Sequence, residues 1–184
     1  MKKISFICIS ILFLMGCTAT LPPKVEISGS YSLQGLKSYA LKLNCEKANI
    51  DPSFKKSFAS SYCQMLEGSI KLSLQKTNPE FQYTNTSSEL DINVTLEELH
   101  GGSAAARFWI GFGAGRTVST VYVKVLKGQE LIAEGRITET TTLTNLMTGT
   151  YSNEDALMQD VPLVARKIAE FVNDPVKFKK ENQP

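Results

Sequence analysis

Residues 88–99 read SELDINVTLEEL, and the alternation of side chains along this stretch decides the expected fold class. Every second residue is apolar: Leu90, Ile92, Val94 and Leu96. The residues between them are polar: Asp91, Asn93, Thr95 and Glu97. A period of two is typical of a β-strand with one buried and one wet face, which antiparallel sheets commonly present. The stretch therefore predicts a strand in a mostly antiparallel sheet.

Three other stretches carry strand signals. Alternate positions in residues 38–45 are held by Tyr39, Leu41, Leu43 and Cys45. Residues 117–141 contain two runs rich in Val, Ile and Thr, separated by Lys127, Gly128 and Gln129, which is the pattern of a β-hairpin. Residues 80–84, EFQYT, add a short strand. Together these stretches predict a sheet of four to five strands.

Two stretches have helical periodicity. The first begins at Asp51 and Pro52, because Asp can cap free backbone N–H groups and Pro has no N–H to lose there. It is expected to end near Lys76. The second begins at Ser152 or Asn153, and Pro162 inside its apolar stripe predicts a kink or two shorter helices. Each helix has one apolar stripe, so both are expected on one face of the sheet, in an α+β fold. Residues 36–175 should form this single domain, followed by a frayed tail at 176–184.

The first sixteen residues have the features of an export signal. Lys2 and Lys3 precede an apolar run, ISFICISILFLM, that is too short for a membrane span of about 20 residues. The run ends in Leu14, Met15, Gly16 and Cys17, which resemble the Leu-x-Gly-Cys box of bacterial lipoprotein precursors. The alternative is an ordinary signal peptide with a cysteine near its cleavage site.

The lipoprotein resemblance implies a diacylglyceryl group on the Cys17 sulfur, cleavage before Cys17 and acylation of the new amino terminus. Several acyl chains on one residue would hold the protein firmly at a membrane. Residues 17–35 would then be the lipidated N-terminus and a tether, in which Val25 and Ile27 could add an edge strand. The residue after Cys17 is Thr18 and not Asp. In this respect the sequence resembles lipoproteins that are sorted to the outer membrane and face the periplasm.

Charge and cysteine content limit the expected ligands and cross-links of the chain. Once residues 1–16 are removed, Lys plus Arg falls from 20 to 18, equal to Asp plus Glu, so nucleic acid is not an expected partner. Cys8 leaves with the signal and Cys17 would carry lipid, so Cys45 and Cys63 remain as a disulfide pair. The alternative is two small buried residues that never meet. With one histidine, His100, and no Cys-x-x-Cys spacing, no metal or other cofactor is expected.

Residues 101–116, GGSAAARFWIGFGAGR, have the most unusual composition in the chain. The glycines do not fit a dinucleotide fingerprint, because Arg116 stands where its last glycine should be and a Val-rich strand follows. A flexible connection whose aromatic residues fold back on the sheet is one interpretation. The other is an interaction segment, since small residues, aromatics and arginine favour close contacts: Arg107, Phe108, Trp109, Gly111, Phe112, Gly113 and Gly115.

This glycine-rich stretch and the hairpin after it are similar to those of an uncharacterised family of small bacterial lipoproteins, catalogued as a domain of unknown function. Arg107, the Gly-x-Gly-x-Gly element and the strands from Thr117 to Thr140 carry the similarity. The resemblance implies a domain with helices and strands behind a lipid anchor, and it brings no known reaction.

Catalytic patterns are weak, so no catalytic residue is assigned. His100 beside a turn is typical of a solvated side chain, and Ser103 lacks the G-x-S-x-G elbow. The sequence therefore predicts a non-enzymatic, lipid-anchored envelope protein that binds another envelope component, associates with itself or helps an assembly. The alternative is an envelope hydrolase, which would need Ser103, His100 and an acid to converge in a pocket.

Overall fold

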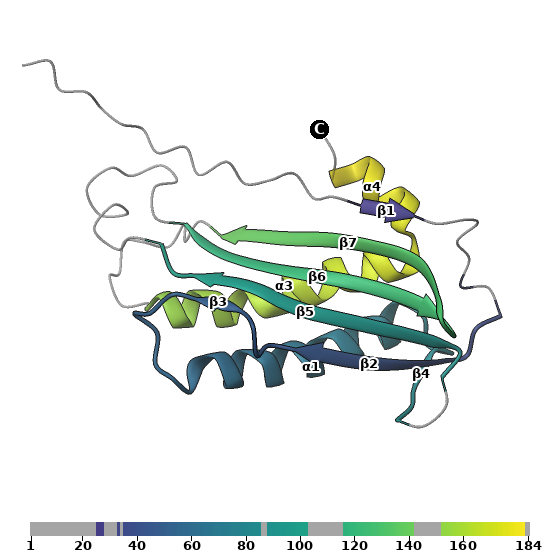
Figure 1. Cartoon of the computed structure of the whole chain (residues 1–184), viewed down its shortest axis with the longest axis horizontal. Coiled ribbons are helices and arrows are strands. Elements are labelled where there is room, and N and C mark those ends of the chain that lie inside the picture. Colours follow the sequence, from purple (N-terminus) through teal and green to yellow (C-terminus); the bar gives the residue numbers. More distant parts are fainter. Residues whose placement is uncertain are drawn as a thin grey trace, which may run out of the picture.

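The computed structural model has an α+β architecture, with helices packed on one face of a single sheet (Figure 1). It describes residues 25–27, 33, 35–85, 88–102, 116–141 and 152–182. The elements within these ranges are β1 (Val25–Ile27), β2 (Ser38–Asn44), β3 (Asn49–Ile50), α1 (Phe58–Thr77), β4 (Gln82–Tyr83), β5 (Leu90–His100), β6 (Thr117–Lys127), β7 (Glu130–Thr141), α3 (Asn153–Asn173) and α4 (Pro175–Asn182). None of the described helices is both long and apolar enough to cross a membrane.

The sheet is mixed and has seven strands, in the order β1-β7-β6-β5-β2-β4, with β3 pairing to β5. The pairs β1–β7, β7–β6 and β6–β5 are antiparallel, whereas β2 is parallel to both β5 and β4, and β3 is parallel to β5. The expected antiparallel sheet of four to five strands was therefore correct only for one half. The other half is parallel because β2 and β5 are joined through α1, and a crossover of this kind brings parallel strands together.

The predicted alternation and hairpin are confirmed. The apolar residues of β5 are fully buried, as are Val121, Val123 and Val125 of β6. The turn between β6 and β7 lies at Gly128, whose φ of 62° is in the left-handed region that glycine adopts without strain. The polar residues that alternate with them, such as Asp91, Asn93 and Thr95 of β5 and Lys124 of β6, consequently point to the opposite face of the sheet.

Helices α1 and α3 lie side by side on the buried face of the sheet (Figure 1). They run parallel: the backbone N–H of Lys55, just before α1, donates to Glu154 in the first turn of α3 (2.8 Å). At the other end, Asn173 Nδ2 donates to Thr77 Oγ1 (2.7 Å). Apolar stripes of both helices close the core over the sheet, including Tyr62, Leu66, Ile70, Leu74, Leu157, Val161, Val164, Ile168 and Phe171.

Helix α1 begins at Phe58, seven residues later than the predicted start at Asp51. The backbone N–H of Asp51 donates to Leu99 O (2.9 Å), which continues the pairing of β3 with β5. The Asp51 side chain then accepts from the N–H of Ser53 (2.9 Å) and fixes a turn. The Asp-Pro pair therefore ends a strand instead of starting the helix.

The C-terminal part also differs from the prediction. Pro162 was expected to cause a kink or to divide the segment into two shorter helices. Helix α3 is instead one helix with Pro162 inside it, and Pro162 is exposed. Its start is confirmed, since Ser152 and Asp155 form a capping box. The expected frayed tail forms α4, which contacts β1. Its Phe178 is buried against Phe171, with ring centroids 5.6 Å apart.

Candidate binding surface

The sheet face opposite to α1 and α3 carries rows of polar side chains, and none of the described helices packs on it. Register places Glu26 of β1, Glu134 of β7 and Lys124 of β6 in one row. Arg136 of β7 and Tyr122 of β6 are paired in the next row. These residues alternate with the buried ones, so the same pattern that builds the core builds this surface.

A hollow of about 350 Å³ lies on this face. Its lining comes from four strands: Glu26, Glu97, Tyr122, Glu134 and Arg136. Glu97 stands next to a shift in the pairing of β5 with β6, between Leu96 and Glu98. Such an irregularity redirects a side chain locally. Here it brings Glu97 within reach of Arg136, two strands away.

Hydrogen bonds hold the side chains of the hollow in place. The Arg136 guanidinium donates through Nη2 to Glu97 Oε1 (2.9 Å) and through Nε to Glu97 Oε2. Two parallel bonds of this kind fix the planes of both groups. The Tyr122 hydroxyl donates to Glu134 Oε2, which also lies 3.7 Å from Lys124 Nζ. The groups are therefore preorganised before any ligand arrives.

The hollow has three carboxylates and one guanidinium in its lining. Burial and the neighbouring Glu134 carboxylate raise the pKa of Tyr122 to about 12, so its hydroxyl remains a donor at neutral pH. The hydrogen bonds that Arg136 donates to Glu97 raise the pKa of its guanidinium, which keeps its charge. Acceptors outnumber donors. The arrangement suits a partner that presents amines or hydroxyls, and it can bind such groups through exchange of hydrogen bonds.

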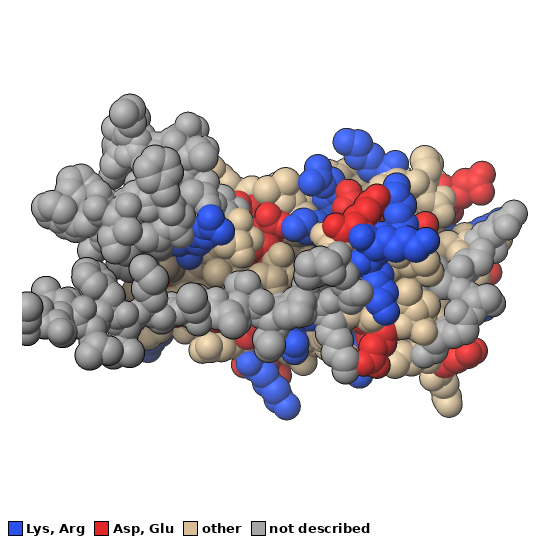
Figure 2. Space-filling view, turned by 90° about the horizontal axis from the view of Figure 1, so that it is seen from above, with Lys and Arg blue, Asp and Glu red and all other residues tan. Residues whose placement is uncertain are grey.

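Seen from the β1 side, basic and acidic side chains are intermixed over the part of the surface that the structure describes (Figure 2). Several are paired, among them Arg166 with Glu170 (3.5 Å) and Lys177 with Glu181 (3.8 Å). Opposite charges this close largely cancel each other beyond a Debye length. Recognition on this side would therefore depend on individual side chains and not on a broad electrostatic field.

His100, at the end of β5, lies beside Asp51. Its Nδ1 is 3.1 Å from Asp51 Oδ2, and the N–H of Gly101 donates to the same oxygen (3.2 Å). Hydrogen bonds from Ser53, chiefly its backbone N–H, lower the pKa of Asp51 to about 2. The pair has the orientation of an acid that positions a histidine. Ser103, the nucleophile of the hydrolase interpretation, lies outside the described residues.

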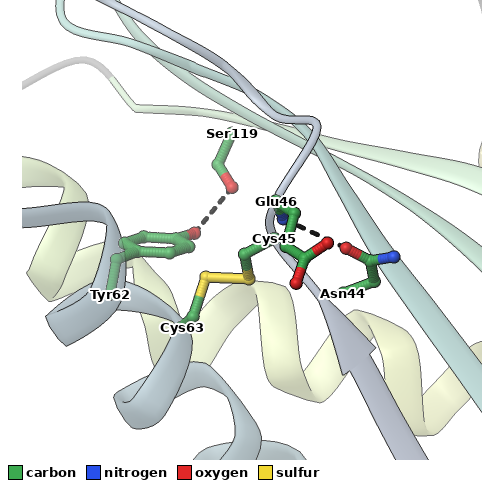
Figure 3. The surroundings of a disulfide bond; sticks show 6 residues. All are labelled: Asn44, Cys45, Glu46, Tyr62, Cys63 and Ser119. Atoms are coloured by element: carbon green, nitrogen blue, oxygen red, sulfur yellow. Dashed lines mark hydrogen bonds between the residues drawn. A yellow bond between two sulfur atoms is a disulfide. The ribbon is translucent and has the colours of Figure 1, made fainter.

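Cys45 and Cys63 are joined by a disulfide, with Cα atoms 6.7 Å apart (Figure 3). The bond links the residue after β2 to α1. The adjacent Tyr62 is fully buried, and its hydroxyl lies 2.6 Å from Ser119 Oγ of β6. Desolvation by burial raises the pKa of Tyr62 to about 12. Two successive residues of α1 therefore fasten the helix to both ends of the strand order β6-β5-β2.

The other residues singled out from the sequence lie outside the described ranges. These are the lipoprotein box, Leu14 to Cys17, and the interaction segment, Arg107, Phe108, Trp109, Gly111, Phe112, Gly113 and Gly115. Among the described residues, no group of three or more His, Cys, Asp or Glu could hold a metal ion. Sequence reasoning missed the hollow, although the alternation of β7 already placed Glu134 and Arg136 on one face.

A protein-family model described as "Domain of unknown function (DUF4410)" matches residues 47–158. This range runs from β3 to the first turns of α3 and contains most of the residues that line the hollow, together with the Asp51–His100 pair. Among curated proteins, no relative matches the sequence.

Solved structures resemble this chain at low identity. Protein XCC0632 from Xanthomonas campestris, of the DUF330 family, has a TM-score of 0.49 at 11% identity and covers 84% of this chain and 92% of its own. The PelC dodecamer from Paraburkholderia phytofirmans has a TM-score of 0.48 at 9% identity, covering 78% and 96%. A DUF4136 family protein from Bacteroides thetaiotaomicron has 0.38 at 8%, covering 83% and 97%. Likenesses at this level assign no function to the present chain.

Proposed function

The chain belongs to the family described as domain of unknown function DUF4410, and from this premise we propose that it is a lipid-anchored, non-enzymatic binding or assembly module of the bacterial envelope. The partner is another envelope protein or a second copy of the chain. The lipid would anchor the protein to the periplasmic side of the outer membrane, because Thr18 and not Asp follows Cys17.

The sheet face on which none of the described helices packs is the observation that carries this proposal. One face of the sheet is fully used for the core, whereas the other presents the hollow lined by Glu97, Tyr122, Glu134 and Arg136. Hydrogen bonds join these four side chains in two pairs, Arg136 with Glu97 and Tyr122 with Glu134, so a partner would meet a rigid surface on strands. Preorganised polar groups lower the entropic cost of binding.

The position of the anchor supports the same proposal. Cys17 is eight residues before Val25, the first residue of β1. Eight extended residues reach at most about 28 Å. Because Glu26 of β1 lines the hollow, the lipid would hold the binding face close to the membrane surface. Partners in that membrane would be met at a raised effective concentration.

Photo-cross-linking in intact cells tests the binding face. A photo-reactive residue at Thr95, which is the register partner of Tyr122, should capture a discrete partner that mass spectrometry identifies. Adding Arg136→Ala should reduce this capture strongly, because Glu97 loses its bidentate partner and the hollow changes shape. The same photo-reactive residue at Gln129, in the exposed turn, serves as the matched control.

Equal capture from Thr95 and Gln129, or no effect of Arg136→Ala, would contradict the binding face. A photo-reactive residue at Trp109 asks the same question of the proposed interaction segment, from Arg107 to Gly115. Capture from Trp109 alone would move the binding site from the sheet face to that segment.

The hydrolase alternative has one specific observation in its favour, the contact of His100 with Asp51 (3.1 Å). An acid that orients a histidine is two thirds of a nucleophilic triad. A fluorophosphonate probe tests it: labelling of Ser103 that disappears in His100→Ala would favour the hydrolase. Absence of labelling in the native chain would leave Asp51 and His100 as the link between the turn after β3 and the end of β5.

A further inference from the structure

Large apolar side chains are exposed on the outer face of the helix layer. Among the described residues, five large hydrophobic side chains are exposed, and three of them lie on α1 and α3: Leu72 (67%), Met65 (41%) and Leu163 (38%). Exposed apolar groups that gather on one face commonly mark an interaction site.

Two of these residues, Met65 and Leu72, lie on one face of α1, and Leu163 lies on α3. The contacts that join the two helices are 99 residues apart in sequence at their N-terminal ends and 96 residues apart at their C-terminal ends. Leu163 follows Met65 by 98 residues and therefore stands at the same level in the parallel pair. Leu72 is two turns after Met65 on α1.

A continuous uncharged stripe runs along α1 through two of these residues. Its members are all exposed and follow the 4-3-4-3 spacing of one helix face: Ser61, Met65, Gly68, Leu72 and Gln75. Gly68, in the middle, has open space where a Cβ would stand. A glycine at the centre of a helix surface allows the backbone of another helix to approach closely.

We propose that this stripe, which we name the α1 stripe, is the contact surface between two copies of the chain. It is self-complementary about its centre: Met65 comes three residues before Gly68 and Leu72 four residues after it. When two such helices cross antiparallel at Gly68, Leu72 of one copy packs on Met65 of the other. A two-fold contact of this kind is the commonest form of self-association.

The charges beside the α1 stripe fit the same pairing. Glu67 and Lys71 lie on one flank, and their side chains are 41% and 30% exposed. In the antiparallel pair, Glu67 of each copy faces Lys71 of the other, so opposite charges meet along the seam twice. Lys71 is held in position by Glu67 of its own helix (2.6 Å) and by the ring of Tyr83 (3.8 Å).

The geometry is compatible with the lipid anchor, so this inference rests in part on the proposed function. Helix α1 lies on the β2 side of the sheet, whereas β1, the strand that follows residue 24 in sequence, is the opposite edge strand (Figure 1). A two-fold axis parallel to the direction from β2 to β1 makes the two α1 helices antiparallel. It also leaves both β1 strands on the same side, toward one membrane.

Attachment to one membrane also compensates for the small size of the contact. Stable dimers commonly bury about 800 Å² on each partner, which is more than one helix face offers. Two copies confined to one membrane meet at a raised effective concentration, which strengthens a weak contact. We therefore expect a dimer on membranes that dissociates when the chain is diluted in solution.

Photo-cross-linking of the full chain in intact cells tests the α1 stripe. A photo-reactive residue at Leu72 should give a product of twice the chain mass, in which residue 72 is joined to the peptide that carries Met65 of the second copy. The same photo-reactive residue at Val176 of α4, which is 45% exposed, is the matched control and should give little of this product. With the photo-reactive residue at Ser61, Leu72→Glu should lower the yield by roughly tenfold.

A charge reversal tests the seam without touching the apolar residues. Glu67→Lys should lower the yield, because two lysines would then face each other, and adding Lys71→Glu should restore it. Failure of the double variant to restore the yield, or capture of only a different protein from Leu72, would overturn the proposal.

Ultracentrifugation of the unlipidated chain with Cys17→Ala separates this inference from the proposed anchor. Dimers that form at high concentration and vanish with Leu72→Glu would uphold the α1 stripe even if the anchor proposal fails. A chain that stays monomeric at every concentration and gives no cross-link on membranes would refute the α1 stripe while leaving the anchor standing.

Discussion

At Gly135 the backbone of β7 lies close to a side chain of α3. A Cβ placed there would lie 2.9 Å from Cε2 of Phe171 and 3.4 Å from Cγ2 of Val25. Both neighbours are buried, so they have little room to move. We predict that Gly135→Ala lowers the free energy of unfolding by about 1–3 kcal/mol through overpacking. Urea denaturation followed by circular dichroism measures this change.

Gly68 is the matched control for that measurement. Open space surrounds the position of its Cβ, and the residue lies inside α1. Gly68→Ala should therefore leave the stability of the single chain unchanged or raise it by up to about 1 kcal/mol, since alanine favours the helix. If Gly135→Ala were as harmless as Gly68→Ala, the close packing of Phe171 on β7 would be wrong.

Asp51 should make the stability of the fold depend on pH. Hydrogen bonds from Ser53 lower its folded-state pKa to about 2, below the ordinary value of 3.8. The ionised carboxylate thus stabilises the folded state above pH 4, and this contribution is lost as the pH falls toward 2. We predict that Asp51→Asn costs about 1–3 kcal/mol at pH 7 and much less at pH 2. Thermal melting across this range checks it, and a cost that is equal at both pH values would exclude the charge effect.

At the scale of elements, the Cys45–Cys63 bond is the covalent link between β2 and α1. The two cysteines are 18 residues apart, and closing a loop of this size stabilises a fold by about 3 kcal/mol in the chain-entropy model. Reduction should therefore lower the urea midpoint of the native chain, whereas the double variant Cys45→Ser, Cys63→Ser should not respond to reductant. Thiols that react with maleimide in the non-reduced protein would show that the bond is absent.

Two Asp-Pro pairs show which part of the helix pattern could be predicted. Asp51-Pro52 has the signal of a helix start, yet the Asp51 side chain closes a turn onto Ser53 (2.9 Å). The same pair at Asp174-Pro175 does start a helix, α4, where Asp174 Oδ1 accepts from the N–H of Lys177 (2.8 Å). In both pairs the Asp side chain accepts a hydrogen bond from a backbone N–H. The two pairs differ because the backbone N–H of Asp51 also donates to Leu99 O, which pairs this residue with β5.

The strands were predictable and their order was not. Alternation fixes which residues of β5, β6 and β7 are buried, because a slip by one residue would turn the core outward. The parallel partner of β5 depends on the path through α1, which a period of two does not encode. The hollow depends on the alternation and on the strand order. Glu97 and Arg136 meet across β6, and Glu26 comes from a segment whose composition predicts a tether.

At the scale of the whole molecule, the hollow and the α1 stripe face away from each other. The hollow lies on the sheet face opposite to α1 and α3, and the α1 stripe lies on the outer side of the helix layer. A dimer through α1 would therefore leave both hollows accessible. The order β1-β7-β6-β5-β2-β4 sets the tether at one edge and α1 near the other, so anchoring and pairing do not compete for the same residues.

The site of lipid attachment decides where the whole molecule works, and Cys17 is the predicted site. Cys17→Ala should leave the precursor without lipid, since a methyl side chain cannot accept a diacylglyceryl group. Labelling cells with a radioactive fatty acid should mark the native chain and not the variant, and membrane fractions should lose the variant. Cys8→Ala is the matched control, because Cys8 lies inside the apolar run and should not affect labelling. A Cys17→Ala chain that still carried fatty acid and stayed on membranes would refute the lipoprotein assignment.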